Sequence, residues 1–210
     1  MKNKLYVNEL FNSIDGEGRR AGELASFIRL CGCNLRCSYC DTTYAFTEGT
    51  PMAVEEILSQ LRYRNITLTG GEPLLQDVHL LLQRLQDRDV NIETNGSVSI
   101  RPYLSYSHVW FTVDYKSISS GMTTAMKEEN FQLLRPQDVL KFVVGTHADL
   151  EQARKICAYF KPSCPIYISA VFAAIEPKEI VAYMEAYRLM NWRLQLQLHK
   201  YIWPPTARGV

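Results

Sequence analysis

The amino-acid sequence predicts an α/β fold, a partial (open) parallel βα barrel of about six units. Two observations support this prediction. Strand-like apolar runs alternate with helical patterns along nearly all 210 residues, which is typical of parallel strands joined by right-handed crossovers. A complete eight-unit barrel typically takes about 250 residues, so this chain is too short to close one. No repeat or linker divides the sequence, and we expect a single domain over residues 1–210.

The strands are expected where short runs of apolar and β-branched residues are bounded by polar or turn residues. The first run leads directly into a cysteine-rich loop. In the last run, leucines alternate with Gln195 and Gln197, so that strand has one polar face. The expected strands span residues 25–30, 65–69, 90–94, 109–113, 139–144, 166–169 and 193–198.

Amphipathic patterns between these runs predict the helices. Thr50-Pro51 predicts a helix start, with Thr50 as the N-cap and Pro51 at the first helical position. Apolar residues then recur over 54–61 with a period of 3.6, and further helices are expected over 74–85, 150–160 and 177–189. The longest irregular connection spans 115–135. Long loops at the carboxyl ends of strands are where such folds place their active sites.

Composition and charge argue against several classes of function. Lys plus Arg number 23 against 22 for Asp plus Glu, a balance that does not support a nucleic-acid-coating surface. No apolar run approaches the about 18 residues that a membrane span needs, and residues 1–9 carry no secretory signal. Three of the six cysteines are clustered, which fits a metal site in a reducing cytoplasm better than a disulfide framework. We therefore expect a cytoplasmic protein without a nucleic-acid or membrane partner.

The most informative feature is the run Cys33-Asn-Leu-Arg-Cys37-Ser-Tyr-Cys40. Three thiolates at this spacing can hold three corners of one compact cluster, whereas ordinary ferredoxin clusters and structural zinc sites are closed by four protein ligands. The spacing therefore indicates an iron with a position open to a non-protein ligand. A zinc knuckle with a distant fourth ligand is the alternative, and Cys31 competes as a ligand. We interpret Cys31 as a small packed side chain, and the remaining two cysteines as buried thiols.

A second motif, Gly70-Gly71-Glu72-Pro73, follows the second expected strand and precedes a helix. By itself it fits a tight turn, although a pair of glycines also lets a ligand approach the backbone. Together, the two motifs resemble the signature of the radical S-adenosylmethionine (SAM) superfamily. The resemblance implies a [4Fe–4S] cluster on Cys33, Cys37 and Cys40, with SAM on its open iron. It also implies a partial barrel of the radical SAM type.

Within that superfamily the chain is similar, nearly from end to end, to the 7-carboxy-7-deazaguanine synthase family. The resemblance implies a lyase that converts 6-carboxytetrahydropterin to 7-carboxy-7-deazaguanine with loss of ammonia, in queuosine or other 7-deazapurine biosynthesis. SAM would be regenerated in each turnover and Mg²⁺ would be required. The segments that carry the resemblance are 11–18, 27–30, 32–42, 93–96 and 197–200.

The resemblance also implies roles for individual residues. Thr42 would be the Mg²⁺ ligand, although a threonine at this place also fits a helix cap. The substrate would be bound by Ile14, Asp15, Gly16, Glu17, Arg29, Thr94, Gln197 and His199. SAM would be bound by Gly70, Gly71, Glu72, Gly96, Asp114, Tyr115, Lys116, Ser169 and Val171.

Several of these residues have other readings. Arg29 can hold a substrate carboxylate through a bidentate pair, or it can form an ion pair in the barrel with an acid such as Glu17. Many family members have Gln where this chain has Asp15. Asp114 and Lys116 also fit a solvated charge pair, and His199 also fits a structural histidine.

Two rival functions remain at this stage. A glycyl-radical activating enzyme shares the cysteine spacing but acts on a large protein, and an iron–sulfur electron carrier or zinc-stabilised binding module needs no SAM. The resemblance implies a small pterin substrate and an electron donor such as flavodoxin or ferredoxin. We also expect a homodimer, because an incomplete barrel leaves sheet edges that an interface would cover.

Overall fold

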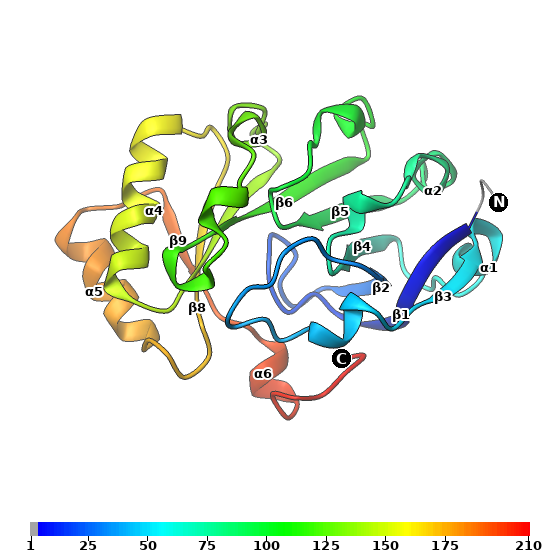
Figure 1. The fold of residues 1–210 in the computed structure, drawn as a ribbon, viewed down its shortest axis with the longest axis horizontal. Helices are drawn as coiled ribbons and strands as arrows, with labels where there is room; N and C mark the ends of the chain where they lie inside the picture. Colours follow the sequence, from blue (N-terminus) through cyan, green and yellow to red (C-terminus); the bar gives the residue numbers. More distant parts are fainter. Residues whose placement is uncertain (1–3) are drawn as a thin grey trace.

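The computed structural model describes residues 4–210 and contains a nine-stranded sheet in the order β3-β1-β2-β4-β5-β6-β7-β8-β9 (Figure 1). Strand β2 and strands β4 to β9 run parallel to one another, and β1 pairs antiparallel with both β2 and β3. Strands β3 and β9 stand at opposite edges, so the sheet is curved but not closed. The predicted open, parallel α/β architecture is therefore confirmed. No helix within residues 4–210 has the length and apolar character needed to cross a bilayer.

Most elements lie close to their predicted positions. The strands are β1 (Lys4–Ile14), β2 (Leu24–Leu30), β3 (Thr50–Ala53), β4 (Asn65–Gly70), β5 (Asp89–Thr94), β6 (Val109–Lys116), β7 (Val139–Val144), β8 (Ile166–Ala170) and β9 (Trp192–Gln195). The α-helices are α1 (Val54–Leu58), α2 (His79–Arg84), α3 (Glu128–Gln132), α4 (His147–Phe160), α5 (Pro177–Ala186) and α6 (His199–Ile202). Short 3₁₀ turns are η1 (Thr43–Phe46), η2 (Pro73–Leu75), η3 (Arg101–Tyr103), η4 (Ile118–Ser120) and η5 (Thr123–Ala125).

The prediction of a helix start at Thr50-Pro51 was wrong. Both residues belong to β3, where Pro51 lies opposite Tyr6 of β1. A proline, which has no N–H to donate, is tolerated there because β3 is an edge strand. Helix α1 begins only at Val54. Its start is capped by the Glu56 carboxylate, which accepts a hydrogen bond from the Ala53 N–H at 2.7 Å.

Three further boundaries differ from the sequence prediction. The helix expected over 74–85 is divided into η2 and α2, and the segment 115–135 contains α3 and two 3₁₀ turns. Strand β9 ends at Gln195, so Gln197 lies in the connection to α6. Strand β1 was not predicted at all, although buried Leu5 and Val7 flank exposed Tyr6 as strand alternation requires.

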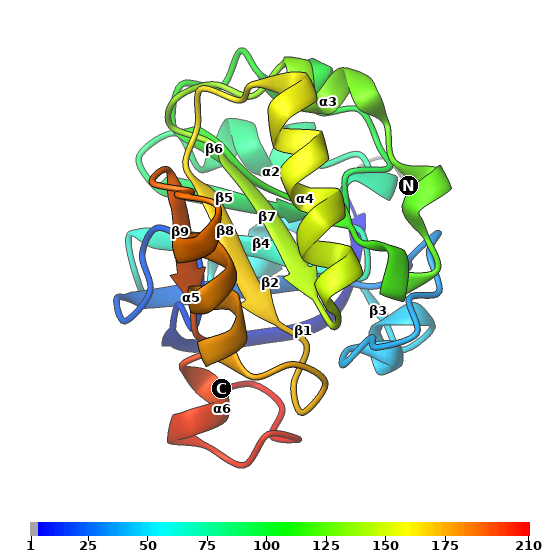
Figure 2. The ribbon, with the colours of Figure 1, turned by 90° about the vertical axis from the view of Figure 1, so that its left-hand side faces the viewer.

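The hydrophobic core lies between the convex face of the sheet and the helices. Figure 2 shows α4 and α5 crossing the outer face of the later strands. Alternate residues of the parallel strands point to this side, and burying each such large side chain contributes about 1.5–3 kcal/mol. Fully buried members include Ile66, Leu68, Val90, Ile92, Phe111, Val113, Leu140, Phe142, Ile166 and Ile168.

The other residues of the same strands give the concave face a polar lining. Thr67, Asn91 and Thr112 are buried there, and Glu93 and Lys141 face the same interior. A parallel sheet that is covered by helices on both faces has apolar residues on both. The polar concave face therefore marks the interior of the partial barrel as the place where the chain can bind a polar ligand.

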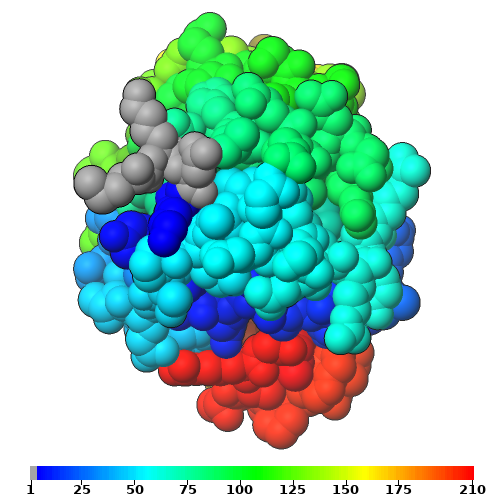
Figure 3. All heavy atoms as spheres, turned by 90° about the vertical axis from the view of Figure 1, so that its right-hand side faces the viewer, coloured from blue at the N-terminus to red at the C-terminus, as the bar shows by residue number. Residues whose placement is uncertain are grey.

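The C-terminal residues cross the open side of the barrel. The Gln195 side-chain oxygen accepts a hydrogen bond from the Gly18 N–H at 2.7 Å, and the Leu198 N–H donates to the Gly16 carbonyl at 2.9 Å. Beyond α6, the Arg208 guanidinium lies 3.6 Å from the centre of the Tyr44 ring. Figure 3 shows this C-terminal segment, in red, packed below the blue N-terminal strands. The loop after β1 and the C-terminal segment together cover the gap between the sheet edges.

Candidate active site

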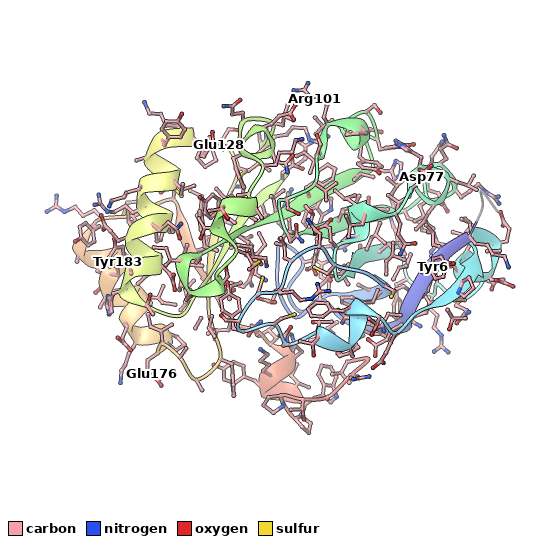
Figure 4. The ribbon with its side chains drawn as sticks, viewed as in Figure 1. Tyr6, Asp77, Arg101, Glu128, Glu176 and Tyr183 are labelled. Atoms are coloured by element: carbon pink, nitrogen blue, oxygen red, sulfur yellow. The ribbon has the colours of Figure 1, made fainter. Side chains whose placement is uncertain are left out.

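A cavity of about 700 Å³ opens on the concave face of the sheet. It is lined by the loop after β1, the cysteine loop after β2, the carboxyl-terminal ends of the parallel strands, and the C-terminal segment. Figure 4 shows that side chains also crowd the periphery of the molecule, where the labelled residues lie outside this cavity. The cavity is therefore at the end of the sheet where the sequence predicts the active site.

The cysteine loop brings Cys33, Cys37 and Cys40 to one wall of the cavity. The Leu35 N–H donates to Cys33 Sγ at 3.4 Å, and the side-chain amide of Asn95 approaches the same sulfur at 3.7 Å. Donors of this kind stabilise a thiolate ligand and tune a bound cluster. Three half-buried cysteines on one wall, with N–H groups directed at the sulfur of one of them, fit an iron–sulfur cluster.

The remaining cysteines lie elsewhere. A Cβ placed on Gly49 would lie 2.8 Å from Cys31 Sγ, so the Cys31 side chain packs beneath Gly49 and does not line the cavity. Cys157 lies in α4 and Cys164 just before β8, and burial raises the pKa values of their thiols to about 12 and about 11. These placements agree with the interpretation of all three as packed thiols.

No three His, Cys, Asp or Glu side chains within residues 4–210 converge as ligands of a single metal ion would. In a [4Fe–4S] cluster each cysteine binds a different iron, so its sulfurs need not converge on one point. The spread of the three sulfurs is therefore compatible with a cluster.

The Gly70-Gly71 pair lies where β4 passes closest to the exit of β2. Gly70 has φ +150°, and a Cβ on it would overlap the Leu30 backbone. A Cβ on Gly71 would overlap the Gly32 carbonyl oxygen and lie 2.7 Å from Cys33 Cβ. Both glycines line the cavity next to the cysteine loop. The motif therefore permits close approach of two backbones, and it leaves room for a ligand on the cavity side.

Glu72 is fully buried and does not line the cavity. Its carboxylate accepts hydrogen bonds from the Leu74 N–H at 3.0 Å, the Asn95 N–H at 2.7 Å and the Thr94 hydroxyl at 2.9 Å. The structure therefore places Glu72 as the group that fixes the end of β5, where Thr94 and Asn95 lie.

Arg29 and Glu17 both line the cavity, and each is held by its own ion pair. Arg29 forms an ion pair with Glu9 of the neighbouring strand at 2.9 Å, so its partner is not the Glu17 considered from the sequence. Glu17 instead pairs with Lys141 of β7 at 2.9 Å. Burial would raise the pKa of Glu17, but the Lys141 ammonium and the surrounding donors hold it below its usual range. Glu17 is thus kept ionised as a hydrogen-bond acceptor.

Two further residues hold Glu17 in place. Ser169 donates to its carboxylate at 3.1 Å, and the Gln197 side-chain amide donates at 3.2 Å. Ser169 is fully buried and does not line the cavity, whereas Gln197 does. The predicted role of Ser169 beside SAM therefore has less support from its position than a role in orienting Glu17.

Asp15 and His199 complete this end of the cavity. Asp15 forms an ion pair with Arg20 at 2.9 Å and accepts a hydrogen bond from the Thr67 hydroxyl at 2.7 Å. Its carboxylate is therefore directed toward Thr67 of β4. His199 packs so closely against Gly16 that a Cβ on this glycine would overlap the imidazole Nδ1. Burial lowers the pKa of His199, so the imidazole is neutral near pH 7 and can accept or donate a hydrogen bond.

The end of β6 contributes Asp114 and Lys116, which form an ion pair at 2.8 Å and both line the cavity. The other Asp114 oxygen, Oδ1, is buried without a hydrogen-bond partner within residues 4–210. An unpaired buried oxygen of this kind is costly, and a ligand hydroxyl would satisfy it. Strand alternation turns Tyr115 to the opposite face, where it packs against Phe131 and Phe142.

The remaining predicted residues lie as follows. Thr94 lines a smaller chamber of about 130 Å³ that shares most of its lining residues with the main cavity, and Val171 and Ile14 line the main cavity. Gly96 has φ +78°, and a Cβ on it would lie 3.2 Å from the Asp114 carbonyl oxygen. Thr42 also lines the main cavity, where its hydroxyl donates to Asp41 at 2.8 Å.

Sequence reasoning missed several residues of the cavity. Lys141 and Glu93 were not assigned a role, and neither were Tyr44 and Arg208, which border the C-terminal side. A signal for Lys141 exists, because a single lysine interrupts the apolar run of β7 as Arg29 interrupts that of β2. Tyr44 and Arg208 carry no such signal, because they meet only through the path of the C-terminal segment.

Comparisons with known proteins agree with this geometry. The model of the radical SAM superfamily matches residues 27–161. The chain is 46% identical to the 7-carboxy-7-deazaguanine synthase of Clostridium acetobutylicum, over 97% of this chain and 98% of that protein. It is 39% identical to the protein of the same name from Chlorobaculum tepidum, over 98% and 97%. A crystal structure of QueE from Escherichia coli has the same fold, with a TM-score of 0.73 and 24% identity over 92% of this chain and 94% of that one.

Proposed function

This chain belongs to the 7-carboxy-7-deazaguanine synthase family of the radical SAM superfamily, and from that premise we propose how its own residues serve the reaction. The enzyme is a lyase that converts 6-carboxytetrahydropterin to 7-carboxy-7-deazaguanine with loss of ammonia. Its similarity to synthases along nearly the whole chain does not favour a glycyl-radical activase, an electron carrier or a zinc module.

A [4Fe–4S] cluster and SAM follow from membership of the superfamily. We propose that Cys33, Cys37 and Cys40 are the three protein ligands, because these are the cysteines that line the cavity. When bound, the reduced cluster and SAM supply the 5′-deoxyadenosyl radical that takes a hydrogen atom from the substrate. The protein's part is to orient the two molecules and to keep water out.

The SAM site is proposed next to the cysteine loop. Gly71 leaves the backbone open on the cavity side, and Lys116 offers an ammonium to the carboxylate of SAM. The unpaired oxygen of Asp114 is an acceptor for a ribose hydroxyl. Val171 lies on the same cavity wall, where it provides an apolar contact for the adenosine.

The substrate site is proposed between Arg29 and Glu17. A guanidinium can bind the substrate carboxylate through two parallel hydrogen bonds. The ionised Glu17, held by Lys141, accepts hydrogen bonds from the N–H groups of the aminopyrimidinone edge. His199 and Gln197 lie next to Glu17 and add polar contacts at the same edge, and Thr94 faces the smaller chamber.

We propose Thr42 as a Mg²⁺ ligand that acts together with the substrate. Magnesium requires six oxygen ligands and keeps several waters, so a single threonine hydroxyl cannot hold it alone. Asp41 lies beside Thr42, but its carboxylate is paired with Lys200 at 3.3 Å. Substrate oxygens must therefore complete the shell, and metal and substrate should bind cooperatively.

We further propose that flavodoxin or ferredoxin supplies the electron and that the enzyme is a homodimer. The dimer proposal rests on β3, an edge strand that an interface would cover. Light scattering on a size-exclusion column tests it, and a mass of one chain at micromolar concentration would contradict it.

The observation that carries the proposed function is that the three cysteines, Arg29 and Glu17 line one cavity. The test is an anaerobic assay of the reconstituted enzyme with SAM, dithionite, Mg²⁺ and 6-carboxytetrahydropterin, analysed by mass spectrometry. We expect 7-carboxy-7-deazaguanine and ammonia without stoichiometric loss of SAM, and no product from a Cys37→Ala variant. Cleavage of SAM without formation of a deazaguanine would refute the assigned substrate while leaving the superfamily intact.

A further inference from the structure

One carboxylate in the cavity differs from all the others in its charge environment. Within residues 4–210, the other cavity carboxylates each have an ion-pair partner: Asp15 with Arg20, Glu17 with Lys141, Asp41 with Lys200, and Asp114 with Lys116. Glu93 forms no ion pair within these residues, and Lys141, the ammonium that acts to lower its pKa, is paired with Glu17. A carboxylate without a counter-ion in a buried cavity is unusual, since burying an unpaired negative charge is costly.

The position of Glu93 is set by strand alternation. Val90 and Ile92 of β5 are fully buried against the helices, so Glu93 faces the barrel interior. It is a lining residue both of the main cavity and of the smaller chamber. The Thr69 side chain of β4 is a hydrogen-bonding neighbour of its carboxyl group. The carboxyl group is thus free to reach a ligand at the boundary between the two spaces.

The groups around Glu93 favour its protonated form. Lys141 faces it from β7, Asp114 and Lys116 from β6, and Glu17 and Asp15 from the loop after β1. Burial raises the pKa of Glu93; Lys141 opposes that effect, and the negative charges of Glu17 and Asp15 add to it. A carboxylic acid whose pKa is raised above its usual value keeps its proton to higher pH, so it can give that proton as a general acid before its carboxylate acts as a base.

We propose that Glu93 is the acid–base catalyst of the ammonia-releasing step. This inference rests on the proposed function, which requires that one ring nitrogen leave the substrate. Glu93 is positioned for that role because, among the described residues, it is the one side-chain carboxyl group that lines the cavity without an ion-pair partner.

The proton transfers balance without any oxidant or reductant. The Glu93 O–H gives its proton to the departing nitrogen, and the C–N bond breaks with its electron pair going to that nitrogen. The Glu93 carboxylate then takes a proton from the neighbouring ring carbon, and the C–H electron pair forms the new ring double bond. Ammonia leaves, the pyrrole ring becomes aromatic, and Glu93 ends protonated as it began.

The test compares the hydrogen-transfer steps with ammonia release in a Glu93→Gln variant, using substrate deuterated at C6. The side chain keeps its size but can no longer exchange a proton. We expect deuterium to appear in SAM as in the wild type, because those steps do not use Glu93. Ammonia and product formation should fall about 100- to 10,000-fold, and an isomer of the substrate should accumulate. A Glu93→Asp variant, which keeps a shorter carboxyl group, should recover part of the rate.

Two outcomes would overturn the proposal. The first is product formation in Glu93→Gln within about threefold of the wild type. The second is loss of deuterium transfer together with product, which would make Glu93 a substrate-positioning residue. If the wild type itself neither labels SAM nor forms product, the proposed function fails instead. Infrared difference spectra give a readout without turnover: the wild type should show a protonated carboxyl band that Glu93→Gln lacks, and absence of that band would also count against the proposal.

Discussion

Replacing Gly71 with alanine should disturb the cysteine loop through backbone contact alone. The φ of Gly71 is not in the left-handed region, so alanine fits its backbone conformation. The added Cβ would nevertheless lie 2.7 Å from Cys33 Cβ and 2.8 Å from the Gly32 carbonyl carbon. These atoms belong to the chain leaving β2, and they cannot rotate away as the end of a flexible side chain can. The start of the cysteine loop must move.

The size of the effect follows from three contributions. Forcing an extra carbon into a packed site costs about 1–3 kcal/mol. The Gly32 carbonyl accepts a hydrogen bond from the Glu72 N–H at 2.8 Å, and weakening that bond costs about 1 kcal/mol. Alanine restricts the unfolded chain, which offsets about 0.4–1 kcal/mol. We therefore expect Gly71→Ala to lower the free energy of unfolding by about 1–3 kcal/mol.

The measurement is anaerobic denaturant unfolding, together with iron and sulfide analysis and SAM affinity after reconstitution. The matched control is Gly145→Ala, where the nearest atom to a new Cβ is the mobile Ser119 Oγ at 3.3 Å. The control should stay within about 0.5 kcal/mol of the wild type and should keep its cluster. Gly71→Ala should lose both stability and cluster content. Equal stability and full cluster content in both variants would refute the steric argument.

Four further substitutions test other parts of the site. Cys37→Ser should abolish the absorbance of the cluster, whereas Cys31→Ser should retain it. Loss of the absorbance in both variants would show that Cys31 is also a ligand. Arg29→Met should raise KM by about 30- to 1,000-fold without changing SAM affinity, and an unchanged KM would place the substrate carboxylate elsewhere. Lys141→Met leaves Glu17 buried without its cation, which should cost about 3–5 kcal/mol of stability. In the wild type the pKa of Glu17 lies below 4.5, so the ionised form persists until the pH falls through that lowered value. In Lys141→Met burial raises the pKa, so kcat/KM should begin to fall at a higher pH. A pH profile identical to that of the wild type would contradict this assignment.

The parallel part of the fold could be predicted from sequence because each strand buries one face against helices. That burial requires the short apolar runs that the prediction used, and β4, β5 and β7 lie within a residue of their expected bounds. Strand β1 could not be recognised in the same way, because it lies next to an edge strand and carries polar residues such as Asn8 and Glu9. The prediction of a helix start at Thr50-Pro51 was wrong for a related reason. A proline at the first helical position and a proline in an edge strand cannot be told apart from sequence unless β1 is known.

Site residues that belong to a local sequence motif could be predicted. Ion pairs that depend on how distant strands pair could not. The three cysteines and Gly71 are close in sequence to the strand ends that position them, and they line the cavity. The partner of Arg29 is Glu9 because the β1–β2 register places the two residues opposite each other. Which cation pairs with Glu17, and which carboxylate is left without one, depends on the arrangement of several strands and could not be read from the sequence.

The hydrogen bonds that cross the open side of the barrel have a consequence for biosynthesis. Gly18 and Gln195 are separated by 177 residues, and Glu17 and Gln197 by 180. Contacts between such distant residues form late, because a long loop must close before they contribute. During translation the cysteine loop leaves the ribosome well before its enclosure can form, since domains fold as the chain emerges from the N-terminal end. A nascent chain thus carries the three cysteines of the proposed cluster site before it has the enclosure that confines a radical, and that hazard ends only when the segment from β9 to Gln197 is in place.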